Sequence, residues 1–301
     1  MKTKETPVEV IGLGEVLWDV FPEGRRVGGA PYNFAYFCAR LGARSRIVSR
    51  VGNDQEGREL LEAISAQGVD PSLVQIDQER PTGMVKVSVG PDGVPIFECQ
   101  EDAAWDYIEL TDEAVAAVST ADIVGFGTLA QRKPTSWKTI HALLAKAPSS
   151  CIRVCDVNLR RQYYSPEFIT ESFLQADVVK INEQELEMIR EILNLSPDDD
   201  ETARFLVDEF DLRALVLTLG PKGAKAWSQE SYAEVPGLVV RVRDTVGSGD
   251  AFAATFAMEL VRGSSLSTAL YWANVAGAYV ATQPGATPDF SWEILRTFGS
   301  H

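Results

Sequence analysis

The chain has 301 residues, 45% of them hydrophobic and 24% charged, which is typical of a globular protein with one large α/β domain or two smaller ones. Its formal net charge of −15 at pH 7 argues against nucleic acid or an anionic membrane surface as a partner. The sequence contains no apolar stretch long enough to span a membrane.

Short apolar, β-branched runs alternate along the chain with longer amphipathic stretches. This alternation predicts a mostly parallel sheet covered by helices, in a single domain over residues 1–301. The predicted strands, in chain order, are Val8–Gly12, Arg46–Val51, Ala121–Gly125, Ile152–Asp156, Val178–Ile181, Ala214–Thr218 and Ala224–Trp227. The predicted helices are Asn33–Leu41, Asp54–Ala66, Thr135–Ala145, Glu183–Leu195, Asp199–Phe210, Asp250–Val261 and Leu266–Thr282.

Two stretches depart from this alternation and predict β-hairpins. Thr82–Cys99 has alternating apolar residues on both sides of Gly90-Pro91-Asp92-Gly93. Val16–Phe21 and Arg25–Val27 predict a second hairpin. Because neither hairpin is large enough to fold alone, we expect residues 15–28 and 82–103 to pair into a small β lid. The open edges of such a lid would also allow a homodimer.

The cysteines and histidines bear on metal sites and on location. Four cysteines have neither the spacing of a disulfide scaffold nor that of a zinc ribbon, and there are two histidines, one of them terminal. We therefore expect reduced cysteines, no zinc site and a cytoplasmic protein.

The segment Asp244-Thr245-Val246-Gly247-Ser248-Gly249-Asp250 precedes an apolar run with helical spacing. Two glycines around a serine allow successive N–H groups to point toward one place and bind an anion, and the helix dipole adds to this attraction. A carboxylate beside such an anion site is suited to take the proton from an attacking hydroxyl. The segment therefore predicts a phosphotransferase with Asp250 as the base and Gly247, Ser248 and Gly249 as the anion hole.

Five further motifs precede this segment in a fixed order. They are Gly12-x-Gly14-Glu15-x-x-x-Asp19, Gly28-Gly29-Ala30-Pro31-x-Asn33, Asp156-Val157-Asn158-Leu159-Arg160, Lys180-Ile181-Asn182-Glu183-Gln184-Glu185 and Thr218-Leu219-Gly220-Pro221-Lys222-Gly223. Together with the last motif they resemble the ribokinase-like (PfkB) carbohydrate kinases over about residues 8–288. Segments around Asp19, Asn33, Trp105 and Arg132 are most similar to bacterial fructokinases. The resemblance implies a ribokinase-like three-layer α/β/α, Rossmann-like domain with a small β-sheet lid, which uses ATP and Mg²⁺ and in some cases K⁺.

A free sugar presents many hydroxyls, and short carboxylates and amides are suited to bind them. The resemblance places Asp19 and Asn33 on the sugar, and a helix N-cap is the alternative for Asn33. Gly28 and Gly29 allow close approach of the backbone. Arg160 and Trp105 are two further candidates for binding the sugar. The alternative role of Arg160 is a structural ion pair, and that of Trp105 is core packing.

The resemblance assigns the remaining candidates to the nucleotide and to cations. Asn182 and Glu185 act on Mg²⁺ through water, with helix capping as the alternative for Asn182. The nucleotide candidates are Lys180, Thr218, Gly220, Gly223, Gly247, Gly249 and Asn274. The backbone around Asp244 and Val246 resembles the family's monovalent-cation site.

Other functions remain open from the residues alone. Gly125-Phe126-Gly127-Thr128-Leu129-Ala130 fits a dinucleotide-binding fingerprint, but Gln131-Arg132-Lys133-Pro134 interrupts the helix that this fingerprint requires. A non-catalytic sugar-binding regulator is a second alternative. Within the kinases, ribokinase, 2-keto-3-deoxygluconate kinase, nucleoside kinase and phosphosugar kinase compete with D-fructose phosphorylation, and Arg25, Arg26 and Arg132 could serve a phosphosugar.

Overall fold

The computed structural model describes residues 7–22, 24–89, 95–159 and 165–300, and its centre is a nine-stranded sheet. The strand order is β13-β12-β11-β10-β9-β8-β1-β4-β5. Neighbouring strands are parallel from β11 to β5, whereas β12 and β13 are antiparallel. The strands are β1 Glu9–Leu13, β4 Arg44–Gly52, β5 Val74–Asp77, β8 Ile123–Gly127, β9 Ile152–Asp156, β10 Val178–Asn182, β11 Ala214–Thr218, β12 Gly223–Trp227 and β13 Tyr232–Pro236.

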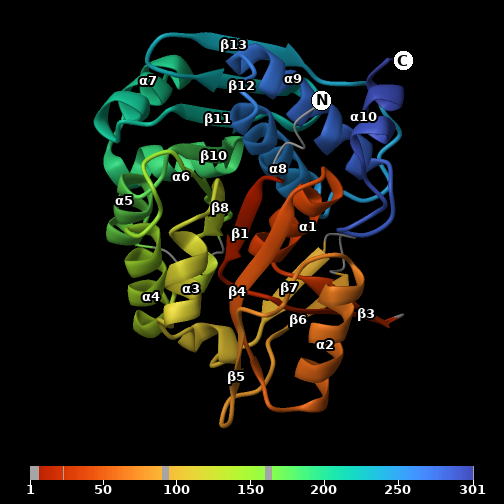
Figure 1. Cartoon of the computed structure of the whole chain (residues 1–301). Coiled ribbons are helices and arrows are strands. Elements are labelled where there is room, and N and C mark those ends of the chain that lie inside the picture. Colours follow the sequence, from red (N-terminus) through yellow and green to blue (C-terminus); the bar gives the residue numbers. More distant parts are fainter. Residues whose placement is uncertain (1–6, 23, 90–94, 160–164, 301) are drawn as a thin grey trace, which may run out of the picture.

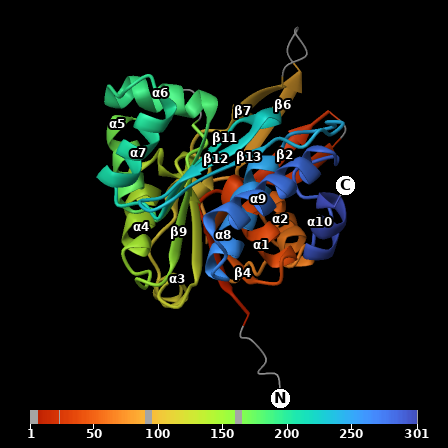
Figure 2. The ribbon, with the colours of Figure 1, turned by 90° about the horizontal axis from the view of Figure 1, so that it is seen from above.

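Helices cover both faces of this sheet (Figure 1, Figure 2). One face carries α1 Ala30–Arg40, α2 Gln55–Ala66, α8 Ser248–Val261, α9 Leu266–Ala281 and α10 Trp292–Gly299. The other face carries α3 Asp112–Val118, α4 Pro134–Leu144, α5 Pro166–Leu174, α6 Glu183–Leu193 and α7 Asp199–Glu209. A hydrophobic core lies on each face of the sheet, and successive strand residues pack into opposite cores. Val10, for example, belongs to the first core and Ile11 to the second. The three-layer prediction is confirmed.

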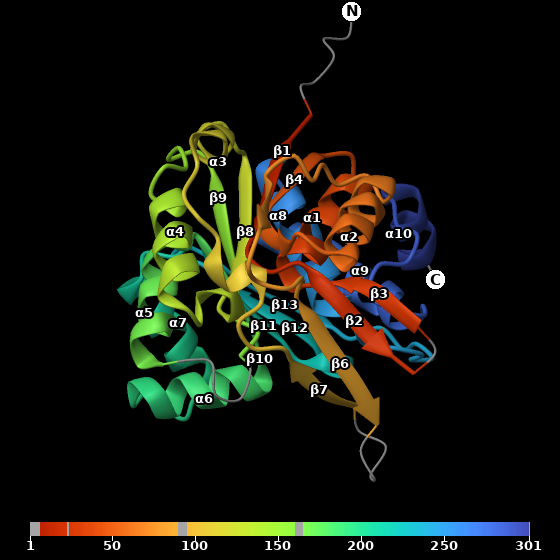
Figure 3. The same ribbon diagram turned by 90° about the horizontal axis from the view of Figure 1, so that it is seen from below.

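A second sheet of order β3-β2-β6-β7 forms the lid, which projects from the main sheet in Figure 3. Its strands are β2 Leu17–Phe21, β3 Gly24–Gly28, β6 Met84–Val89 and β7 Pro95–Cys99. Both predicted hairpins are present, and the parallel pairing of β2 with β6 joins them. The expected small sheet is therefore confirmed.

Two helices begin earlier than predicted, and both differences affect the site. α1 begins at Ala30, after Gly29 with φ 109°, and Pro31 occupies its first turn, where a missing N–H costs little. Asn33 is thus inside the helix and does not cap it. α8 begins at Ser248, after Gly247 in the left-handed conformation at φ 81°, so Asp250 lies in the first helical turn.

Candidate active site

Three neighbouring parallel strands end at the same edge of the sheet, and the last residue of each is polar. Asp156 ends β9, Asn182 ends β10 and Thr218 ends β11, and Asn182 is in register with Thr218. Ligands of open α/β sheets bind outside these carboxyl ends. The loops around this edge hold most of the predicted site.

The N-terminal turn of α8 meets α1 at this site. The Asn33 side-chain Nδ2 donates a hydrogen bond of 2.7 Å to Oδ2 of Asp250. Asn33 is 5% exposed, and its Oδ1 is buried without a hydrogen-bond partner among the described residues. The Asn33 side chain therefore holds Asp250 through Nδ2, while its Oδ1 is an acceptor without a partner among the described residues.

The predicted anion hole rests on the loop between α9 and α10. A Cβ on Gly247 would collide with the carbonyl oxygen of Ala286, so this position tolerates no side chain. Asp244 joins the same two segments, because its Oδ1 accepts from the Val246 N–H at 3.0 Å and its Oδ2 from the Gly285 N–H at 3.0 Å. Asp244 thus fixes the turn that presents the N–H groups of residues 247–249.

Lys180 brings a buried positive charge to the same turn. Its Nζ donates to both carboxylate oxygens of Asp156 at 2.9 Å, and a Cβ on Gly249 would lie 2.8 Å from Nζ. Burial lowers the pKa of Lys180, but the charges of Asp156, Glu185 and Asp250 outweigh that effect and raise it above its usual value. The ammonium therefore stays charged beside the anion hole. The pairing of Lys180 with Asp156 was not predicted from the sequence.

Asn182 and Glu185 form a capping box at the start of α6. Asn182 Oδ1 accepts from the Glu185 N–H, and Glu185 Oε2 accepts from the Asn182 N–H, both at 2.9 Å. Glu185 Oε1 accepts from the Leu159 N–H at 3.1 Å. Burial raises the pKa of Glu185, while Lys180 acts in the opposite direction. The capping alternative for Asn182 is thus present in the structure, and a role toward Mg²⁺ would come in addition to it.

On the lid side, Asp19 lies on β2 and its carboxylate lies against Gly28. A Cβ on Gly28 would collide with Oδ2 of Asp19, and one on Gly29 would collide with the Glu15 carbonyl oxygen. Gly28 and Gly29 therefore allow β3 to enter α1 close to the carboxylate. Asp19 is half-buried and accessible to a ligand.

Trp105 lies in the short 3₁₀ helix Ala104–Tyr107 and is fully buried. The Arg132 guanidinium lies over its ring, 4.1 Å from the centroid, so the core-packing alternative describes its place in this structure. Arg132 also forms a two-point ion pair with Asp106, at 2.7 Å for Nε to Oδ1 and 2.7 Å for Nη2 to Oδ2. Arg160, the other sugar candidate, lies outside the described residues.

The remaining nucleotide candidates lie along the β11–β12 turn and α9. Thr218 is half-buried, and Gly220 has φ 55° with open space around the position of a Cβ. Gly223 has φ 110°, and a Cβ there would collide with the Val235 carbonyl oxygen. Asn274 is 8% exposed, and its Nδ2 donates to the Pro236 carbonyl oxygen at 2.9 Å, so it holds the chain after β13.

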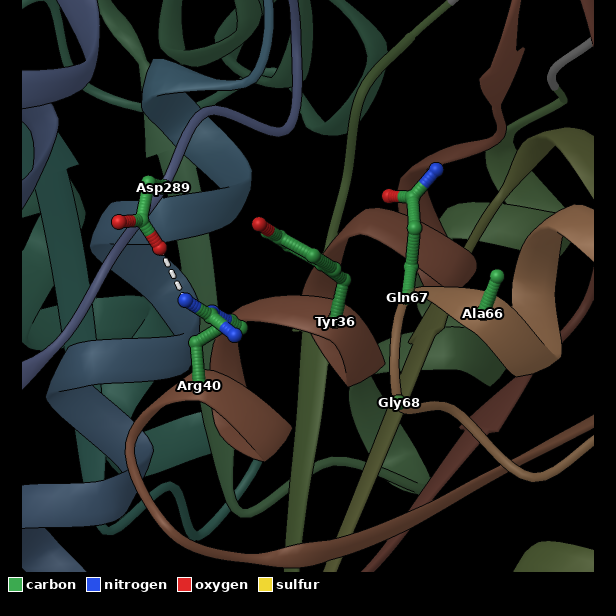
Figure 4. A pocket seen from close by; sticks show the side chains of 6 residues that line it. All are labelled: Tyr36, Arg40, Ala66, Gln67, Gly68 and Asp289. Atoms are coloured by element: carbon green, nitrogen blue, oxygen red, sulfur yellow. Dashed lines mark hydrogen bonds and ion pairs between the residues drawn. The ribbon is translucent and has the colours of Figure 1, made fainter.

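A cavity of about 350 Å³ lies outside this site, between α1, the end of α2 and the loop before α10. Figure 4 shows the Arg40 guanidinium directed at the Asp289 carboxylate across one side of it. Tyr36 Oη donates to the Pro288 carbonyl oxygen at 2.8 Å. None of the predicted catalytic residues lines this cavity.

Two features are absent from the described part of the chain, a cluster of metal-binding side chains and a membrane-spanning helix. No group of three or more His, Cys, Asp or Glu side chains there is arranged to hold a metal ion by itself. None of the helices there is both long and apolar enough to cross a membrane.

Comparison with known proteins agrees with this geometry. The sequence profile described as pfkB family carbohydrate kinase matches residues 12–293. A sugar kinase of Pyrococcus horikoshii is 30% identical over 296 residues, covering 92% of this chain and 91% of that protein. Its solved complex with ATP superposes with a TM-score of 0.81 at 28% identity, covering 92% of this chain and 94% of that one.

Two similar proteins carry the name fructokinase. Fructokinase-1 of Zea mays is 28% identical over an alignment of 310 residues that covers 94% of this chain and 95% of that protein. A fructokinase of Vibrio cholerae, solved with fructose, ADP and a calcium ion, has a TM-score of 0.83 and 25% identity and covers 97% of this chain and 98% of that one. The likeness thus extends over both the main sheet and the lid.

Proposed function

This chain belongs to the pfkB family of carbohydrate kinases, and from this membership we propose that it transfers the γ-phosphoryl group of ATP to a primary hydroxyl of a free sugar, with D-fructose as the preferred acceptor. The observation that carries the proposal is the hydrogen bond between Asn33 and Asp250 beside the anion hole. In this proposal Asp250 is the base and Asn33 is a sugar-binding amide, and their hydrogen bond supports this pair of roles.

The proposed reaction needs one proton transfer and one phosphoryl transfer. Asp250 accepts the proton of the attacking hydroxyl as the new O–P bond forms and the bond from γ-phosphorus to the bridging oxygen of ADP breaks. Asn33 holds the Asp250 carboxylate in place, and its unpartnered Oδ1 accepts from another sugar hydroxyl. Asp19, from the lid, binds further hydroxyls.

The transferring group carries negative charge, and the chain supplies two kinds of stabilisation for it. The N–H groups of Gly247 and Gly249 lie at the start of α8, where the helix dipole favours an anion, whereas the Ser248 N–H donates to the Thr245 carbonyl oxygen at 3.2 Å. The Lys180 ammonium beside Gly249 adds a full positive charge within the buried site. Donors that are already in place need no reorganisation during the reaction, which is why such sites accelerate phosphoryl transfer.

Mg²⁺ fits the charges around Lys180. The Asp156, Glu185 and Asp250 carboxylates all interact with this one ammonium, so the cluster has an excess of negative charge. Both oxygens of Glu185 already accept backbone N–H bonds, which favours contact with a hydrated ion over direct ligation. Asn182, Glu185 and Asp156 would hold the hydrated ion, which supplies charge neutralisation at the phosphate oxygens when it is bound.

The ion pairs formed by Arg132 and Arg25 favour a free sugar over a phosphosugar as the acceptor. Arg132 is 3% exposed and bound to Asp106, and Arg25 forms an ion pair with Glu59 on the α2 side of the lid. Arg26, the third of the predicted arginines, is in register with Asp19 on the lid and packs against Gly285. The fructokinase names of the Zea mays and Vibrio cholerae relatives favour fructose among the free sugars.

A substrate panel tests the proposal. Release of ADP is measured with ATP and Mg²⁺ and one of four acceptors: D-fructose, ribose, 2-keto-3-deoxygluconate or fructose 6-phosphate. We expect kcat/KM to be highest for D-fructose. A higher value for another acceptor would refute the fructose assignment, and sugar binding without ADP release would favour a non-catalytic regulator.

We also propose a monovalent-cation site and a dimer formed through the lid. The turn held by Asp244 supports a K⁺ site at the carbonyls near Asp244 and Val246. Activity in potassium is expected to exceed activity in tetramethylammonium at equal ionic strength. Sedimentation at micromolar concentration tests whether two lids pair.

A further inference from the structure

The loop 284–287, between α9 and α10, touches both halves of the proposed site. Toward the anion hole, the Ala286 carbonyl oxygen occupies the place that a Gly247 side chain would need, and the Gly285 N–H binds Asp244. A displacement of this loop would therefore alter the turn that presents the N–H groups of residues 247–249.

The far end of the same loop is tied to α1. Pro288 accepts a hydrogen bond from Tyr36 through its carbonyl oxygen, and Asp289 pairs with Arg40. The loop is thus anchored at Asp244 on one side and at α1 on the other. Gly285, which makes the bond to Asp244, has φ 79°, a conformation that favours glycine.

The lid reaches this loop through Arg26 of β3. Arg26 is in register with Asp19 of β2, so the two side chains leave the lid on the same face. The guanidinium carbon of Arg26 lies 5.0 Å from the centroid of the Phe21 ring, which belongs to that face as well. A Cβ on Gly285 would lie 2.8 Å from Nη1 of Arg26, so the guanidinium rests directly against the loop backbone.

The surroundings of this contact are loosely filled. A cavity of about 300 Å³ lies between β3, α2 and the loop, and both Arg26 and Gly285 line it. Arg26 therefore bridges a gap between the lid and the loop. The cavity leaves open space beside the contact between Arg26 and Gly285.

We propose that Arg26 is a positioning residue that couples the lid to the anion hole by seating loop 284–287 against Gly247. When the lid closes on a sugar, Asp19 contacts the acceptor and Arg26, on the same face, presses on the loop. The anion hole is then held in its catalytic form when an acceptor is present. This inference rests on the proposed sugar kinase activity.

The test compares Arg26→Ala with Arg25→Ala. Arg25 is the next residue on β3 and lines the same cavity, but its guanidinium pairs with Glu59 and lies over the Trp18 ring, so it controls for the loss of a lid arginine that does not contact Gly285. For Arg26→Ala we expect a fall in kcat of about 10- to 100-fold, because small misplacements of catalytic groups have effects of this size. The KM for ATP and the melting temperature should stay close to the wild-type values, and Arg25→Ala should keep the wild-type kcat.

Hydrogen exchange gives a readout that does not depend on activity. Exchange of the amides of residues 282–287 should be faster in Arg26→Ala than in the wild type and unchanged in Arg25→Ala. Equal kcat in Arg26→Ala and the wild type, or unchanged exchange in the loop, would overturn the coupling. A higher KM for the sugar with unchanged kcat would also overturn it and make Arg26 a sugar ligand. If the wild type phosphorylates no sugar, the proposed function fails, and the exchange experiment still decides whether Arg26 seats the loop.

Discussion

The side chain of Asn33 in α1 donates a 2.7 Å hydrogen bond to Asp250 in α8, which joins the acceptor half of the site to the phosphoryl half. This contact defines what each partner contributes. Asp250 has the chemistry of a base, and Asn33 has that of an orienting group which still offers an oxygen to a ligand.

Replacing Asp250 with asparagine should remove proton transfer without changing the shape of the site. We expect kcat to fall by about 10²- to 10⁴-fold, the usual contribution of general base catalysis. Calorimetric titration with ATP and with fructose should give affinities near those of the wild type. Turnover close to that of the wild type would exclude Asp250 as the base.

Asn33→Asp tests the orienting role through the pH dependence. Two carboxylates at hydrogen-bond distance cannot both be ionised easily, so the pKa of the pair is raised. The acidic limb of the pH profile of kcat/KM should therefore move to higher pH than in the wild type. Asn33→Ala, which adds no charge, should lower kcat/KM without this shift. A profile for Asn33→Asp that coincides with the wild-type profile would contradict the contact.

Gly249→Ala tests the place of Lys180. The new methyl group would lie 2.8 Å from the Lys180 Nζ, so the ammonium has to move away from the anion hole. Since hydrogen bonds to charged groups contribute about 1.5–3 kcal/mol, we expect a loss in kcat/KM for ATP of roughly 10- to 100-fold. Lys180→Met should produce a loss of similar size, and the double variant should lose little more than either single one. Additive losses would show that the two positions act separately.

Asp106→Asn tests the ion pair beneath the lid. Asp106 is fully buried and Arg132 is 3% exposed, so the substitution removes a buried carboxylate charge that pairs with the guanidinium. Breaking such a pair costs about 3–5 kcal/mol. Urea unfolding should show this loss in the free energy of unfolding. Asp289→Asn, which removes an exposed partner of Arg40, is the control and should cost under about 1 kcal/mol.

His141 should make stability depend on pH. Its Nε2 donates to Oε1 of the buried Gln131 at 2.9 Å, and burial lowers its pKa below the usual 6.5. The unfolded chain therefore binds the proton more readily, so the free energy of unfolding should fall as the pH drops through 6.5. His141→Gln should weaken this dependence between pH 7.5 and about 5.5, the range in which histidine titrates. Parallel curves for the two proteins in urea unfolding would contradict the assignment.

The parallel sheet could be predicted because its strands are short, apolar and β-branched. β9 and β11 have the predicted bounds, whereas β5 and β13 were not predicted. β13 reads YAEVP and is half-exposed at the sheet edge, so it lacks the apolar run of a buried strand. The helices α3, α5 and α10 were missed as well, although Thr111, Ser165 and Ser291 cap them and could have served as start signals.

For the site, residue types and order predicted which segments matter but not how each side chain is used. Trp105 has the right chemistry to face a sugar, yet the position of Arg132 over its ring is a tertiary contact that no local pattern encodes. The pairing of Asp156 with Lys180 arises because β9 and β10 are neighbours in register. Because the register between β9 and β10 depends on the assembly of the whole sheet, the pairing of Asp156 with Lys180 could not be predicted from the local sequence.

The order of assembly follows from the wide separation of the site's two halves. Asn33 and Asp250 lie 217 positions apart, and β1 has neighbours β4 and β8 that come later in the chain. During synthesis, which proceeds from the N-terminus, an emerging chain can form the acceptor half before α8 exists. On the proposed mechanism, a nascent chain therefore has no complete site, and it cannot consume ATP by this route, until α8 has left the ribosome.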